Sequence, residues 1–177
     1  QRVTRRQFVR NTAVGAAGLA AGTSIVRAGN AEEADTSKIL NYNSDMEYRR
    51  CGKTNLMVSG VCMGGHWKRL NEVIPGLFEG RSWLGAKLDS PDFEKNRYEL
   101  VTRLIERGIN YIDACTGPEV IMYSKALKGR RAKMYLGYSW HGREVRKREW
   151  RTAEKLLEGF VAGLKEAGLE YADLWRV

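Results

Sequence analysis

The sequence predicts an α/β fold, a (β/α)8 TIM barrel of which this chain supplies about the first half. Four short apolar segments alternate with three helical patterns after residue 60, which is typical of a parallel sheet built from right-handed crossovers. A sheet of only four strands would leave long unpaired edges, and residues 171–177 still read as a strand. We therefore expect the second half of the barrel beyond Val177, with an open flavodoxin-like sheet as the alternative.

The individual elements follow from hydrophobic spacing and from the positions of glycine and proline. A hairpin is expected over 46–59 and a short buried strand over 60–65. Helices are expected over about 96–107, 119–127 and 148–167, and further strands over 111–113, 133–138 and 171–177. The last helix is expected to present one apolar face, formed by Leu156, Leu157, Phe160, Val161 and Leu164.

The segment from Gly108 to Asp113 is the first candidate for a functional site. Gly108 is placed to end the preceding helix in the left-handed conformation, and a short strand then leads to Asp113. In helix-wrapped parallel sheets, ligands bind at the carboxyl ends of the strands. Asp113 is therefore a candidate site residue, and the alternative is an aspartate that caps the next helix.

Residues 1–31 have the organisation of an export signal. Arg5 and Arg6 precede a mildly apolar, glycine-rich stretch at 12–26, and small residues at Ala28 and Ala31 offer cleavage sites. The paired arginines followed by an apolar segment resemble a twin-arginine signal, which implies recognition by the twin-arginine export machinery and a periplasmic or other extracytoplasmic location. Residues 32–45 are expected to be a flexible mature N-terminus, and no stable membrane anchor is expected.

The charge argues against a nucleic-acid-binding protein, and the cysteine usage argues against a protein built around disulfides or a metal site. The formal net charge is +9, but five arginines and no acid lie in residues 1–31, so the rest of the chain carries only +4 and no nucleic-acid partner is expected. The spacing of the cysteines along the sequence is not typical of a disulfide framework; they are Cys51, Cys62 and Cys115. With only His66 and His141 beside them, the sequence predicts no metal site.

Several segments together resemble the aldo/keto reductase family. They are the motifs MEYRRCGKT at 46–54, MGG at 63–65, GINYID at 108–113 and LKEAGLEYADL at 164–174. The resemblance covers 46–177 apart from a long, aromatic-rich loop at about 66–96, which is expected to form a lid or an oligomer contact, or simply to cover the barrel end. It implies a (β/α)8 barrel that binds NADP(H) and transfers hydride between small carbonyl compounds and alcohols. Gly64, Gly65 and His66 are the expected cofactor-binding residues.

The catalytic residues that the resemblance implies are mostly replaced. Of the family's Asp, Tyr, Lys and His, only Asp113 matches; no tyrosine follows it, Ser139 stands at the lysine position, and the histidine would fall beyond Val177. We therefore expect an exported NADP(H)-dependent oxidoreductase with an altered catalytic site. A strand register shifted by one residue would let Tyr138, or His141 nearby, supply the proton; alternatively Tyr138 packs against a helix. The alternative function is a catalytically degenerate barrel that binds a ligand or a protein.

Overall fold

The computed structural model describes residues 35–177, so the predicted export signal lies outside the described part of the chain. The fold is α/β, and its centre is a parallel sheet with the strand order β3-β4-β5-β6. This sheet consists of β3 (Met63–Gly64), β4 (Tyr111–Asp113), β5 (Tyr135–Tyr138) and β6 (Leu174–Trp175). An antiparallel hairpin, β1 (Tyr48–Arg50) and β2 (Met57–Ser59), precedes it as predicted. The strands follow chain order, without the reversal of a flavodoxin-like sheet.

Three helices connect the strands of this sheet: α2 (Pro91–Glu106), α3 (Gly117–Ala126) and α4 (Ala153–Ala167). Short 3-10 turns occupy Thr36–Lys38, Leu70–Glu72, Trp83–Gly85, Arg131–Lys133, His141–Arg143 and Arg148–Trp150. Each helix begins at a hydroxyl cap, namely Ser90, Thr116 and Thr152, whose side chain accepts a backbone N–H of the first turn. Helices α2 and α3 begin earlier than their apolar spacing predicted and α4 begins later, because these caps and not the apolar residues set the helix starts.

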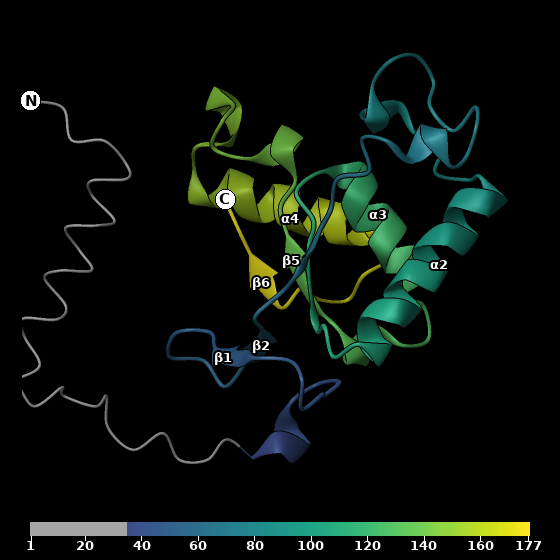
Figure 1. The fold of residues 1–177 in the computed structure, drawn as a ribbon. Helices are drawn as coiled ribbons and strands as arrows, with labels where there is room; N and C mark the ends of the chain where they lie inside the picture. Colours follow the sequence, from purple (N-terminus) through teal and green to yellow (C-terminus); the bar gives the residue numbers. More distant parts are fainter. Residues whose placement is uncertain (1–34) are drawn as a thin grey trace, which may run out of the picture. The chain divides into compact units, whose positions relative to one another are not determined.

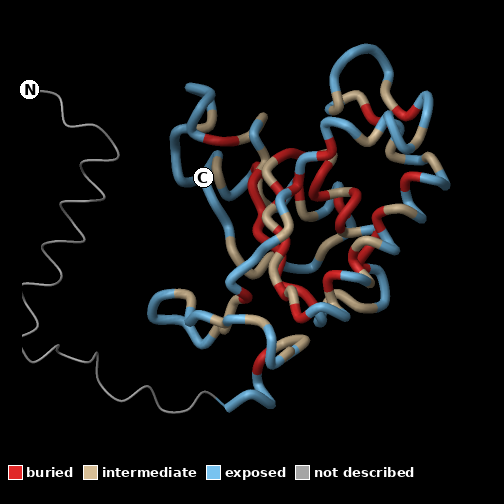
Figure 2. The backbone as a smooth tube through the Cα atoms, viewed as in Figure 1, coloured by how far each residue is buried: buried red, intermediate tan, exposed pale blue. Residues whose placement is uncertain are grey.

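The two faces of the sheet have different surroundings. Ile112 and Leu136 are fully buried and belong to one core cluster with side chains of α2 and α3. Because α2 packs on α3 and α3 packs on α4, the helices cover that face in sequence (Figure 1). Figure 2 shows the buried segments gathered where strands and helices meet. Strand alternation turns Tyr111 and Asp113 to the opposite face.

Helix α4 contacts the core through small residues. The predicted apolar face is wrong in part, because Leu157 is 55% exposed and Val161 is 62% exposed. The buried positions are instead Gly159, Gly163 and Ala167, four residues apart. A Cβ at Gly163 would lie 2.8 Å from the Trp140 ring, so the glycine lets that indole approach the helix closely.

The segment before the hairpin and the loop after β3 also pack against the rest of the fold. Ile39 is buried, and the Asn41 side chain donates to the carbonyl oxygen of Lys133 at 2.7 Å, so this part of the segment predicted to be flexible is held in place. In the loop after β3, Trp67 is buried and its indole N–H donates to the Trp83 carbonyl at 2.9 Å. Within residues 35–177, no helix is both long enough and apolar enough to span a membrane.

We expect Tyr138→Phe to raise the free energy of unfolding by about 1 kcal/mol. The Tyr138 hydroxyl is buried against Gly163, and it has no hydrogen-bond partner among the described residues. The matched control is Tyr48→Phe, which removes a hydroxyl that donates to the Gly108 carbonyl at 2.8 Å and should lower stability by about 1 kcal/mol. Urea unfolding curves of both variants measure the difference. Equal losses of stability would show that the Tyr138 hydroxyl has a partner.

Candidate functional site

A pocket of about 510 Å³ lies at the carboxyl edge of the parallel sheet. It is lined by Met63, Gly64, Gly65, His66, Asp113, Cys115 and Arg176. Three of the four strands contribute through their last residues or the residues that follow them, which is the usual position for a ligand site in a parallel sheet. The structure therefore brings the predicted residues Gly64, Gly65, His66 and Asp113 together.

Asp113 contacts two neighbouring side chains, through an ion pair with Arg176 and a hydrogen bond from Tyr111. Its Oδ1 atom lies 2.9 Å from Nη2 of Arg176 and 3.1 Å from the hydroxyl of Tyr111. Gly137 pairs with Asp113 in the adjacent strand, and a Cβ there would lie 2.5 Å from the Tyr111 hydroxyl. Because Gly137 has no side chain, the Tyr111 phenol and the Asp113 carboxylate can lie next to this strand without a clash. Asp113 does not cap α3, whose cap is Thr116.

Tyr111 is a protonated phenol in this environment. Burial, followed by the negative charge of Asp113, raises the pKa of Tyr111 to about 12, and the Arg176 guanidinium opposes that shift. At neutral pH the phenol therefore carries its proton next to a carboxylate and a guanidinium. Such a group can donate a proton but cannot act as a base.

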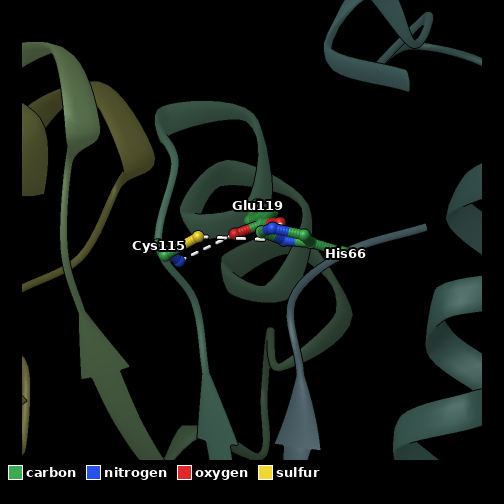
Figure 3. A group of neighbouring side chains, drawn as sticks. All are labelled: His66, Cys115 and Glu119. Carbon is green, nitrogen blue, oxygen red and sulfur yellow. Dashed lines mark hydrogen bonds and ion pairs between the residues drawn. The ribbon is translucent and has the colours of Figure 1, made fainter. Parts of the chain in front are cut away.

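A second group of reactive side chains stands in the wall of the same pocket. Figure 3 shows His66 after β3, Cys115 after β4 and Glu119 on α3 converging on one point. Nδ1 of His66 lies 2.6 Å from Oε1 of Glu119 and 3.7 Å from Sγ of Cys115. Glu119 is fully buried, whereas the His66 side chain is 44% exposed.

Glu119 also holds the start of α3. Its Oε2 atom accepts the backbone N–H groups of Cys115 at 2.7 Å and Thr116 at 3.1 Å, and Thr116 in turn accepts the N–H of Glu119. This reciprocal arrangement is a capping box. A Cβ on Gly65 would overlap the Glu119 carboxylate, so the second glycine of the predicted pair is required by this contact.

The geometry of this cluster excludes a nucleophilic cysteine of the Cys-His-acid type. In such a triad, the thiol and the acid contact different ring nitrogens: one nitrogen takes the thiol proton, while the acid holds the N–H of the other and orients the ring. Here both Cys115 and Glu119 approach Nδ1 of His66. Burial and the Glu119 charge also raise the pKa of Cys115 to about 11, which keeps the thiol protonated at neutral pH.

The other predicted site residues lie away from this pocket. Tyr138 faces α4, where its ring meets Phe160 edge-on at 5.0 Å, in the packing role that the sequence left open. Burial raises the pKa of Tyr138 to about 12. Ser139 is buried, and its hydroxyl donates to Oε1 of Glu144 instead of reaching Asp113. The imidazole of His141 is not part of the pocket lining.

No protein-family model and no curated protein sequence matches this chain. The site is therefore interpreted from its own geometry.

Sequence reasoning missed Tyr111, Cys115, Glu119 and Arg176. Two signals were available: strand alternation places residue 111 on the same face as Asp113, and the spacing from Thr116 to Glu119 is that of a capping box. No local signal pairs Cys115 with His66, because 49 positions separate them.

Proposed function

We propose that this protein is an exported, NADP(H)-dependent oxidoreductase of the aldo/keto reductase type that interconverts small carbonyl compounds and alcohols with an altered catalytic site. Its sheet would then be the first half of a (β/α)8 barrel. Two features support the barrel: the strands follow chain order, and consecutive helices pack along one face of the sheet. The export signal that the sequence predicts at 1–31 supports an extracytoplasmic location.

The observation that carries the proposal is the contact of Tyr111, Asp113 and Arg176 beside the pocket. Reduction of a carbonyl requires a proton for the developing alkoxide oxygen, and a phenol held by charged neighbours can supply it. Tyr111 carries that proton at neutral pH, Asp113 orients the phenol, and the Arg176 guanidinium partly offsets the burial and the Asp113 charge, which oppose ionisation of the phenol. In this proposal Tyr111 replaces the missing tyrosine and Arg176 replaces the missing lysine.

Two features of the pocket support binding of the reactive end of a nicotinamide cofactor. Its volume of about 510 Å³ is within the ordinary range for small-molecule sites. A Cβ at Gly64 would meet no atom within 4 Å, so the backbone there is open to a flat ring. Gly64, Gly65 and His66 are the residues that would contact it. When bound, the cofactor supplies the hydride, while the residues of this chain bind, orient and protonate the substrate.

We expect NADPH to quench the tryptophan fluorescence of the purified chain, because Trp83 packs on His66 at the pocket with ring centroids 4.4 Å apart. The matched control is Trp83→Phe, which should remove most of the quenching without removing binding measured by calorimetry. Turnover of aldehydes with NADPH then distinguishes the enzyme from a barrel that only binds ligands. Absence of binding by both methods would contradict the oxidoreductase proposal.

A further inference from the structure

We propose that His66, Cys115 and Glu119 form a Zn²⁺ site in the wall of the pocket. Their ligand atoms all lie within 4.8 Å of one another. They come from three different elements, the ends of β3 and β4 and the first turn of α3, so their proximity is produced by the fold and not by local sequence. This inference goes beyond the proposed oxidoreductase function and does not depend on it.

The identity of the donors selects the metal. A thiolate, an imidazole nitrogen and a carboxylate oxygen together suit Zn²⁺, whereas Mg²⁺ and Ca²⁺ prefer oxygen donors only. Three protein ligands leave a fourth tetrahedral position, as in zinc sites that keep a water molecule. Because His66 and Cys115 both line the pocket, that position is accessible to water and small molecules from it.

One distance between ligand atoms is already close to that of a tetrahedral site, and a second must increase. Bond lengths of about 2.0 Å to nitrogen and about 2.3 Å to sulfur place a ligating nitrogen and sulfur about 3.5 Å apart. Nδ1 of His66 and Sγ of Cys115 are 3.7 Å apart. Nδ1 and Oε1 of Glu119, now 2.6 Å apart, must separate by about 0.7 Å to admit the metal. His66 can make this movement because its side chain is half-exposed.

Glu119 provides the fixed part of the site. Its Oε2 atom is held by the N–H groups of Cys115 and Thr116, which leaves Oε1 directed toward His66 and Cys115. Hydrogen bonds of this kind to a ligating carboxylate orient it and hold it in place before the metal binds. The buried carboxylate of Glu119 also favours a cation beside its Oε1 atom.

The protons balance in a single binding step. The Cys115 thiol loses its proton to solvent as the Zn–S bond forms. As Nδ1 of His66 binds the metal, the proton between Nδ1 and Oε1 of Glu119 passes to solvent and Nε2 takes one proton from solvent, so the imidazole stays neutral and the net release is the single thiol proton. A bound dication stabilises the thiolate, so it opposes the effect of the Glu119 charge on Cys115.

Titration of the untagged full chain with Co²⁺, after removal of metals with a chelator, tests this proposal. We expect a thiolate-to-cobalt charge-transfer band that saturates at one ion per chain and disappears when Zn²⁺ is added in excess. Cys115→Ser should abolish the band. Cys62→Ser, the matched control at an exposed free cysteine, should leave it unchanged. His66→Gln should weaken Zn²⁺ binding, measured by competition with a chromophoric chelator, by more than about 10²-fold, because loss of an outer contact alone costs 10–100-fold.

Two outcomes would overturn the site. One is a chain that shows no charge-transfer band; the other is a band that persists in Cys115→Ser and is lost in Cys62→Ser. Circular dichroism of each variant separates a lost ligand from a lost fold. Because NADPH binding is measured independently, failure of the zinc site leaves the proposed function standing, and the converse also holds.

Discussion

Tyr111→Phe is expected to lower kcat for NADPH-dependent aldehyde reduction by about 10²–10⁴-fold. This loss corresponds to about 3–5.5 kcal/mol of activation free energy. The substitution removes only the hydroxyl that lies 3.1 Å from Asp113, and the ring remains to fill its space beside Gly137. Because the phenol acts on charge that develops in the transition state, KM should change little. Single-turnover and steady-state kinetics measure both quantities.

Tyr138→Phe is the control for this experiment. Its hydroxyl faces α4, so turnover should equal that of the unaltered chain even though both variants lose a phenol. A large loss in Tyr138→Phe together with normal kinetics in Tyr111→Phe would reverse the assignment and support a rearranged site around Tyr138. Because the Tyr111 pKa is about 12, the phenol stays protonated at neutral pH, and its ionisation should not limit the rate there.

Glu119→Ala is expected to lower the free energy of unfolding of the metal-free protein by about 3 kcal/mol, since it leaves the part-buried N–H of Cys115 and the buried N–H of Thr116 without an acceptor. It also removes half of the capping box at the start of α3, a loss of about 1 kcal/mol within that total. Denaturant unfolding in the presence of a chelator measures the change without a contribution from bound metal.

Glu119→Gln is the matched variant, because its amide oxygen can still accept both N–H groups. We expect it to lose about 1 kcal/mol, from the charge-assisted part of these bonds and the contact with His66. If the alanine and glutamine variants were equally stable, the two backbone hydrogen bonds would not be what Glu119 contributes.

The parts of the fold that local patterns determine were predictable. Gly108 ends α2 with a φ of 79°, as its position after the apolar repeat indicated, and β4 occupies the predicted residues Tyr111–Asp113. The face of α4 was not predictable from hydrophobicity, because its buried positions are Ala167 and two glycines, Gly159 and Gly163, that pack closely on Trp150 and Trp140. Such contacts depend on residues that the chain brings in from elsewhere.

The candidate site divides in the same way. Asp113 was found because a carboxylate at the end of a parallel strand is a recognisable pattern. Arg176 was missed because its contact with Asp113 requires β6 to be placed two strands away from β4. His66 was expected to bind the cofactor with Gly64 and Gly65. Its contact with Glu119 spans 53 positions, so it arises only when the strand ends are assembled.

The capping box of α3 couples the parts of the pocket wall, so that they open together or not at all. One carboxylate joins the first helical turn to the backbone at Cys115 and to the ring of His66. Fraying of that turn would therefore release all three side chains in a single local opening. The exchange rates of the Cys115 and Thr116 amide protons then report how often the wall is intact, and any ligand that holds Glu119 in place would slow them together.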